Sequence, residues 1–401
     1  ILLNIVRVRY LMVCVFLRMT HASDGRLFVF VLVLVSLVIL WGKKVKCLSS
    51  SVFALALGIT VSLVWRTATS SAFEFAPEIF LYLLLPPMLL HSSFEFELSS
   101  LKGNWVGSLT FAFLGTLFSM TWIAIGILVW TRQLDMDISV PKAFLYAAVL
   151  APTDTVATMG MTRSLSIKDK YVFQVLENES VMNDALSVVL VHLFKTMVNS
   201  DRDMSRWIPV DVVMSSLLTT SLSILLGVVF SRAMIRSKAS SLTVHYLTSF
   251  LLYALCECFE LSGILGLFVY GALICPPPPF RESVSSMSTI MEAYVYLTLG
   301  LAFHTYNWRW IVQSLLVLLS CIVGRVLMAY GFGCCLSKYN RRWTTKSILF
   351  FSMCGVRGAI SYALGMLIGD EFIRSTTFVV IVCTIFMFGT FQKCLLHMLL
   401  I

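Results

Sequence analysis

Residues 177–184 read Glu-Asn-Glu-Ser-Val-Met-Asn-Asp and lie at the centre of a long, mostly apolar segment, residues 171–197. A charged side chain inside a transmembrane segment is costly, so it usually faces a protein interior and marks an ion or substrate site. The partners that the rest of the chain supplies for Glu179, Asn183 and Asp184 therefore decide the function.

The composition points to a membrane protein. The chain has 401 residues, of which 58% are hydrophobic and 13% are charged. A soluble domain is about 45–50% apolar and about 25% charged, and a core of this size could not hide the excess. We expect an all-α polytopic membrane protein whose surroundings are lipid, because runs of about 20 apolar residues span a bilayer as helices. The net charge of +9 does not indicate nucleic acid, because the basic residues lie in short loops and act as topology signals.

About thirteen apolar segments are candidate spans. They lie at residues 27–41, 47–65, 77–93, 104–130, 142–161, 171–198, 209–234, 241–258, 260–275, 286–304, 311–336, 345–368 and 375–400. Alternate loops differ about twofold in Lys and Arg content, and the richer set is predicted to be cytoplasmic. The first residues, 1–17, carry Arg7 and Arg9 and fit a leading helix, a surface helix or part of a signal.

Two of these spans contain helix-breaking sequences, one in each half of the chain. Residues 151–155 read Ala-Pro-Thr-Asp-Thr, and residues 355–358 read Gly-Val-Arg-Gly. Paired interrupted spans are typical of transporters with inverted repeats and a site at mid-membrane. Asp154 and Arg357 would offset the dipole ends of the half-helices. The alternative is a kink at Pro152 and a glycine packing contact.

The acidic segment favours cation/proton exchange. On a helix, Ser180 and Asp184 share one face, and Glu179 and Asn183 form a second polar ridge beside it. Away from water, the Asp184 carboxylate would hold either a proton or a metal cation near neutral pH. One such site with two access states gives obligatory exchange, and a single titrating acid favours an electroneutral cycle. The alternative is that these acids only pair with basic residues for structure.

Glu179 is the acid predicted to form such a structural pair. Arg325 lies in an apolar span with no other charge nearby, and an arginine in that position needs an anion. We expect an ion pair between Arg325 and Glu179, with Arg357 as the alternative partner.

Along almost its whole length the chain resembles the eukaryotic sodium/proton exchangers, a branch of the monovalent cation/proton antiporters. The runs that carry the resemblance are FLYLLLPP at 80–87, FAFLGT at 111–116, APTD at 151–154, ESVMNDA at 179–185, GR at 324–325 and GVRGAI at 355–360. The resemblance implies a thirteen-helix fold with two crossing broken helices, in which a core transport domain moves against a dimerisation domain.

The resemblance also assigns roles to individual residues. Asp184 is implied as the ion and proton site with Asn183 beside it, and Asp154 as the acid of the broken helix, so that both aspartates hold the transported Na⁺. Glu179 and Arg325 match the family's ion pair, and Arg357 matches the charge of the second crossing helix. Thr153 and Ser180 would supply further oxygens.

Three departures from the family pattern bear on ion selectivity and the pH set-point. Asn178 stands where the family usually has Gly, Thr155 follows Asp154 where the family usually has Pro, and His91 stands where Asp or Tyr is common. His91 is therefore a candidate modulator of the pH set-point.

The expected domains follow the family. The transport bundle is predicted at roughly 77–198 and part of 286–400, and the dimerisation helices at roughly 27–65 and 209–275. We expect a homodimer, and a cytosolic regulatory protein would bind a C-terminal tail that these 401 residues do not include. The plasma membrane is the expected location, with an endosomal or other organellar membrane as the alternative.

Three classes of function fit a membrane protein with buried acids. The first is an antiporter that exchanges Na⁺ or K⁺ for H⁺ and regulates pH and sodium. The others are a cation channel and a non-transporting receptor or scaffold, against which the paired interruptions argue. We expect no enzyme activity and no cofactor beyond the transported ions, because the sequence has no Gly-rich nucleotide loop ending in Lys-Ser or Lys-Thr.

Overall fold

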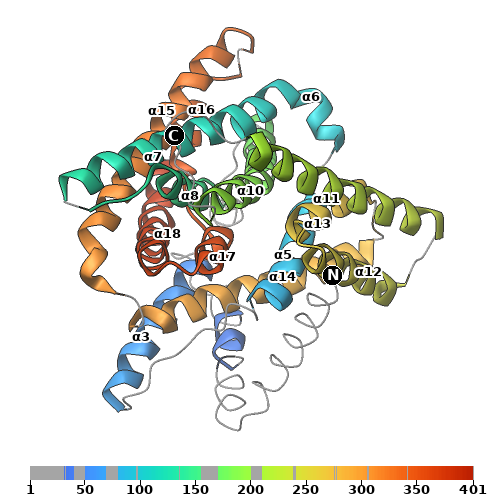
Figure 1. Cartoon of the computed structure of the whole chain (residues 1–401), viewed down its shortest axis with the longest axis horizontal. Coiled ribbons are helices and arrows are strands. Elements are labelled where there is room, and N and C mark those ends of the chain that lie inside the picture. The colour runs from blue at the N-terminus through green and yellow to red at the C-terminus, as the bar shows by residue number, and fades with distance from the viewer. Residues whose placement is uncertain are drawn as a thin grey trace. The chain divides into compact units, whose positions relative to one another are not determined.

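The computed structural model is helical, and the residues that it describes contain no strand (Figure 1). The described residues are 31, 33–39, 50–68, 80–95, 98–134, 136–154, 170–199, 210–237, 241–274, 276, 278–304, 307–340 and 342–400. The chain divides into two compact units. The main segments of unit 1 are Phe53–Glu95 and Ser215–Thr305, and those of unit 2 are Phe96–Met214 and Tyr306–Ile401.

Each unit is built from helices of both halves of the chain. Unit 1 holds most of α3 (Ser50–Ala68) and of α11 (Val210–Ser237), together with η1 (Phe80–Leu84), α5 (Leu85–Glu95), α12 (Leu242–Cys258), α13 (Gly263–Leu273), α14 (Pro278–Leu301) and η3 (Ala302–His304). Unit 2 holds α6 (Leu98–Leu109), η2 (Thr110–Gly115), α7 (Thr116–Gln133), α8 (Val140–Leu150), α10 (Lys170–Asn199), η4 (Trp308–Trp310), α15 (Ile311–Ser337), α16 (Thr345–Met353), α17 (Ala359–Ile368) and α18 (Glu371–Leu400).

Where the chain is described, the predicted spans are mainly helical, apart from the two interrupted stretches and a few residues at span ends. Five described helical segments are long and apolar enough to cross a membrane, and they are Asn104–Gln133, Tyr171–Asn199, Val213–Ser237, Ile311–Ser337 and Glu371–Phe388. Shorter apolar helices occupy several other predicted spans. The total of thirteen stays a prediction, and residues 1–26 lie outside the described residues.

The predicted transport bundle, roughly 77–198 and part of 286–400, has residues in both units, because the chain up to Glu95 clusters with unit 1 and Phe96–Met214 with unit 2. The assignment of transport to one part of the chain and dimerisation to another stays a prediction.

Helical structure stops where the sequence contains the two breaking motifs. Residues 354–358 are non-helical and separate α16 from α17. α8 ends at Leu150, and residues 151–154 are non-helical. Pro152 explains this end, because proline has no N–H to continue the helical hydrogen bonds, and the residue before it, Ala151, still has helical φ and ψ. The continuation of this span, residues 155–161, lies outside the described residues, so the crossing of two broken helices stays a prediction.

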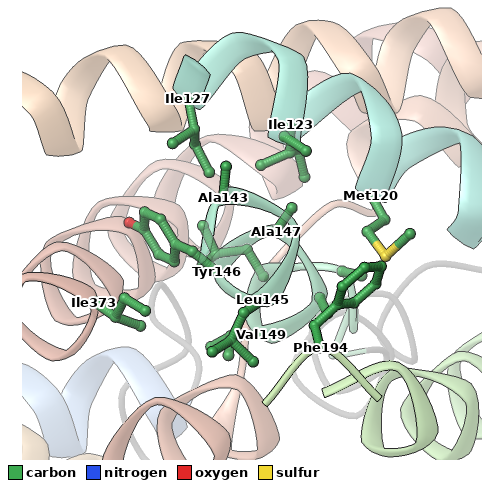
Figure 2. Close-up of a cluster of buried hydrophobic side chains, with 14 of the residues drawn as sticks. Met120, Ile123, Ile127, Ala143, Leu145, Tyr146, Ala147, Val149, Phe194 and Ile373 are labelled. Carbon is green, nitrogen blue, oxygen red and sulfur yellow. The ribbon is translucent and has the colours of Figure 1, made fainter. Parts of the chain in front are cut away.

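α8 lies in the core of unit 2, in contact with α7, α10, α17 and α18 (Figure 1). After Lys142 it is mainly apolar around its whole circumference, with residues 145–150 all buried, as expected of a helix enclosed by others. Ala143 and Ala147 are one turn apart and lie toward Ile123 and Ile127 of α7 (Figure 2). Small residues at this spacing let two helices approach closely, which fixes the end of α8 inside the unit.

In unit 1 the backbones of α3 and α14 touch at two glycines. A Cβ atom built on Gly300 would lie 2.5 Å from the carbonyl oxygen of Leu55, 2.8 Å from the nitrogen of Ile59 and 2.9 Å from Gly58 Cα. These are backbone atoms, which cannot turn aside as a flexible side chain would. A residue larger than glycine at position 300 must therefore push the two helices apart.

We expect Gly300→Ala to lower the unfolding midpoint of the detergent-solubilised chain by roughly 2–6 °C, because overpacking forces the backbone to shift. Gly331→Ala is the matched control, because a Cβ atom at Gly331 in α15 meets nothing within 4 Å. That variant should leave the midpoint unchanged or raise it slightly. Equal midpoints for the two variants would contradict the backbone contact.

Candidate functional site

The polar residues of α10 are enclosed by the helices of unit 2. α10 contains no Gly or Pro in its 30 residues, so nothing in its sequence interrupts the helix. Asn178, Glu179, Ser180 and Asn183 are at most 4% exposed, and Asp184 is partly buried. The two polar ridges predicted from the sequence thus lie in the interior of unit 2, where unpaired charges are costly.

Glu179 and Arg325 form a buried ion pair. Arg325 Nη2 donates to Glu179 Oε2 over 3.0 Å, and Nη1 donates to Oε1. The two side chains are 1% and 4% exposed. This bidentate ion pair joins α10 to α15. Both carboxylate oxygens of Glu179 accept hydrogen bonds from the arginine.

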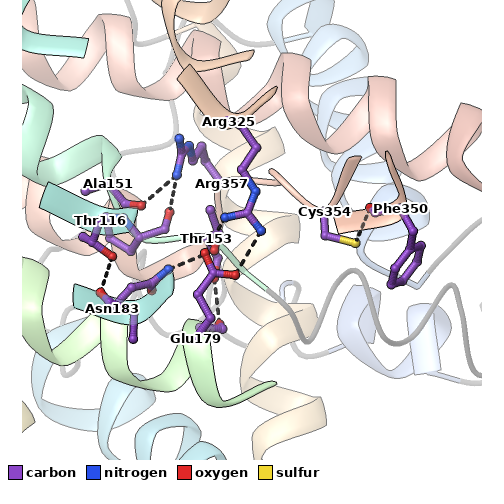
Figure 3. Close-up of polar contacts among 12 residues, drawn as sticks. Thr116, Ala151, Thr153, Glu179, Asn183, Arg325, Phe350, Cys354 and Arg357 are labelled. Carbon is purple, nitrogen blue, oxygen red and sulfur yellow. Dashed lines mark hydrogen bonds and ion pairs between the residues drawn. The ribbon is translucent and has the colours of Figure 1, made fainter. Parts of the chain in front are cut away.

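Thr153 ties α10 to the non-helical stretch that follows α8. Asn183 Nδ2 donates to Thr153 Oγ1 over 2.9 Å, and Ser180 Oγ donates to the carbonyl oxygen of Thr153 over 2.7 Å. Figure 3 shows Asn183 directed at Thr153. Since the amide nitrogen is used in this way, the buried Asn183 Oδ1 is left without a hydrogen-bond partner among the described residues. It is therefore an oxygen that a cation could bind.

The two interrupted stretches touch each other. The N–H of Asp154 donates to the carbonyl oxygen of Val356 over 2.8 Å, which joins the end of the α8 span to the break between α16 and α17. A Cβ atom on Gly358 would overlap the Asp154 carboxylate. Glycine is therefore required at position 358 for Asp154 to occupy this place.

Arg357 is bound to the C-terminal end of α8. Its Nη1 donates to the carbonyl oxygens of Ala151 over 2.8 Å and of Pro152 over 3.1 Å (Figure 3), and its backbone N–H donates to Thr384 Oγ1 over 3.2 Å. Carbonyls at a helix C-terminus have no partner within the helix and carry partial negative charge. The guanidinium satisfies that charge, whereas the ion pair with Glu179 is made by Arg325.

Asp184 differs from Glu179 in its surroundings. It has no ion pair in the part of the chain that the structure describes, and the charged group that acts on it is the Asp154 carboxylate. Two carboxylates near each other repel when both are ionised, and a proton or a cation relieves that repulsion. This pair, next to the Asn183 amide, can therefore bind either kind of positive ion.

His91 lies elsewhere, in α5 of unit 1, and its effect on pH dependence stays a prediction. Sequence reasoning missed two buried hydroxyl residues of unit 2, Ser187 and Thr384. Ser187 follows Asn183 by one helical turn, so the spacing that identified Ser180 and Asp184 could have found it. Thr384 is one of four threonines in the predicted span 375–400, so its sequence position carries no such signal.

Two lysines bind the C-terminal end of α17 and the short loop that leads to α18. Lys142 Nζ lies 2.7 Å from Asp370 Oδ2, and Lys195 Nζ donates to the carbonyl oxygen of Leu367 over 3.1 Å. Gly369, with φ +73°, ends α17 in the left-handed conformation that favours glycine. Partial burial opposes ionisation of Asp370, but the hydrogen bond from Lys142 and the backbone N–H of Ile373 outweigh it and lower the pKa of this carboxyl.

A group whose pKa is lowered on folding adds stability above its unfolded pKa, about 3.9 for Asp, and loses it as the pH falls. We expect Asp370→Asn to cost at most about 1 kcal/mol at pH 7, because the pair is partly exposed and Asn still caps α18. Unfolding midpoints of wild type and variant should differ at pH 7 and approach each other as the pH falls below about 3.9. A difference that is the same at both pH values would exclude the charge as its cause.

The chain is similar to known proteins over most of its length. A family model described as "Sodium/hydrogen exchanger, transmembrane" matches residues 29–400. The chain is 24% identical over 344 residues to Na(+)/H(+) exchanger beta of Oncorhynchus mykiss, covering 79% of this chain and 44% of that protein. It is 24% identical over 395 residues to sodium/hydrogen exchanger 3 of Homo sapiens, covering 89% and 46%. The chain spans about half the length of these curated relatives.

The fold is also similar to a solved structure. The sodium proton antiporter MjNhaP1 from Methanocaldococcus jannaschii aligns with a TM-score of 0.71 and 20% sequence identity, covering 92% of this chain and 97% of that one. At this identity the likeness concerns the all-helical fold, which the two proteins share.

Proposed function

The chain belongs to the sodium/hydrogen exchanger family, and on that premise we propose that it exchanges Na⁺, or K⁺, for H⁺ across a membrane by alternating access. The family is one of integral membrane transporters. The activity is a proposal for this chain, since the exchangers that it matches are about twice as long.

One observation carries the proposal. Asp184 has no basic partner among the described residues, yet it lies beside Asn183, whose Oδ1 is buried and unbonded, and within electrostatic reach of Asp154. Oxygen atoms from carboxylates, amides and hydroxyls are the ligands that hard cations prefer. We assign Asp184 and Asp154 as the acids that bind the cation, with Asn183, Thr153 and Ser180 supplying or orienting further oxygens.

The exchange follows from competition at Asp184. A bound cation keeps the carboxylate ionised, whereas a proton neutralises it, so the two ions exclude each other. If only the loaded forms change access from one side of the membrane to the other, one cation crosses for one proton and no net charge moves. The pair Glu179–Arg325 and Arg357 hold the surrounding backbone and do not need to leave their partners.

The finer architecture follows the same proposal. We propose that the two interrupted spans are crossing broken helices among thirteen spans, because paired interrupted spans are typical of transporters with inverted repeats. We assign transport to unit 2, because it holds the acids, and dimerisation to unit 1, so that two copies form a homodimer. A plasma-membrane location, with an organellar one as the alternative, and a regulatory partner on a cytosolic tail complete the proposal.

Reconstitution tests the function directly. Proteoliposomes with an acidic interior should release protons when Na⁺ or K⁺ is added outside, and the initial rate should not change when a membrane voltage is imposed. A cation channel would instead carry a current that grows with voltage, and a receptor or scaffold would release no protons. Empty liposomes measure the passive proton leak. Comparing the rates with Na⁺, K⁺ and Li⁺ gives the cation selectivity.

A further inference from the structure

The guanidinium of the Arg325–Glu179 pair lies over an aromatic ring. Arg325 Cζ is 4.8 Å from the centroid of the Phe351 ring. Phe351 is fully buried in α16, three residues before the non-helical stretch that begins at Cys354. At this distance the negative face of the ring attracts the cation.

The other contacts of Arg325 leave no room for a second charged partner among the described residues. Its two terminal nitrogens donate to Glu179, and its Nε is buried without a hydrogen-bond partner in the described part of the chain. A Cβ atom on Gly355 would lie 3.1 Å from Arg325 Cγ, so the backbone of the interrupted stretch packs against the aliphatic stem. The ring face thus completes an enclosure in which Glu179 is, among the described residues, the anion paired with this arginine.

The ring itself is held by other aromatic side chains. Its centroid lies 4.2 Å from that of Phe111, in η2, and 5.7 Å from that of Trp343, which precedes α16. Phe111 and Trp343 are also in contact, with ring centroids 5.0 Å apart, and all three side chains are buried. Phe351 is therefore a fixed surface that restricts where Arg325 can lie.

We propose that Phe351 is a positioning residue that holds Arg325 against Glu179 through a cation–π contact. It thereby links α16, which leads into the interrupted stretch, to α10, which carries Asp184. The Arg325–Phe351 contact is inferred from the geometry alone, whereas its effect on transport rests on the proposed function. The competing explanation is apolar packing, in which any side chain of the same shape would serve equally well.

Fluorination of the ring separates the two explanations. Phenylalanines with one, two and three ring fluorines keep nearly the same shape while weakening the negative face step by step. We expect the unfolding midpoint of the full chain in detergent to fall stepwise, by about 2–4 °C across the series at position 351. The same series at Phe350 is the matched control, because that ring is also buried but packs on Phe173, with centroids 5.2 Å apart.

Sodium-driven proton release from proteoliposomes gives the second readout. We expect its maximal rate to fall about threefold across the position-351 series and to stay constant across the Phe350 series, since the cation–π attraction is the property that changes. Midpoints that do not change with fluorine number at 351, or that change equally at 350, would overturn the proposal. If wild type releases no protons, the proposed function fails, and the midpoints still decide whether the contact exists.

Discussion

We expect Asp184→Asn to abolish cation-driven proton release, lowering the rate by about a hundredfold or more, while the chain still folds. An amide has nearly the shape of a carboxyl group but neither takes up nor releases a proton at neutral pH. It also removes the negative charge that the transported cation requires. The measurement is the initial rate of proton release from acid-loaded proteoliposomes after addition of Na⁺ or K⁺.

Two control variants make this result specific. Asp370→Asn introduces the same chemical change at the partly exposed pair with Lys142, and it should leave the rate within a factor of about two. Asp184→Glu keeps a titrating acid and should keep partial activity. The assignment of Asp184 would have to be abandoned if the asparagine variant, correctly folded, exchanged ions at the wild-type rate.

Much of this site could be predicted because its residues are out of place in an apolar sequence. The acids of α10 stand out against the apolar residues around them, and their helical spacing predicts which ones share a face. The interruptions at 151–155 and 355–358 could be predicted because Pro and Gly act on the local backbone. Arg325 was identified as the partner of Glu179 because its span offers no other charge.

Other features depend on tertiary contacts that local sequence does not encode. The link between Asp154 and Val356, and the capping of Ala151 and Pro152 by Arg357, join positions about two hundred residues apart. Which carbonyls an arginine binds is decided by how the segments pack, so spacing along the chain gives no information about it. Phe351 was missed because an aromatic residue in an apolar span looks the same whether it packs on carbon or on a guanidinium.

Removing one member of the buried ion pair should be far more damaging than removing both. Arg325→Met leaves the Glu179 carboxylate buried without its partner, and we expect a loss of about 3–5 kcal/mol in the free energy of unfolding. The double variant Glu179→Gln/Arg325→Met has no unpaired charge, so it should recover most of that loss. Unfolding of the detergent-solubilised variants by denaturant or heat gives the comparison, with the single variant Glu179→Gln completing the cycle.

The same double-mutant cycle shows whether the ion pair only stabilises the fold or also takes part in transport. If the pair only holds α10 to α15, the double variant should fold and release protons at close to the wild-type rate, because Asp184, Asn183 and Thr153 are unchanged. If the arginine also sets the position of α10 during access changes, the double variant folds but transports slowly, because methionine has no charge to fix the helix. An Arg325→Met variant as stable as wild type would show that Glu179 does not need the arginine, which is incompatible with a charge pair at most 4% exposed.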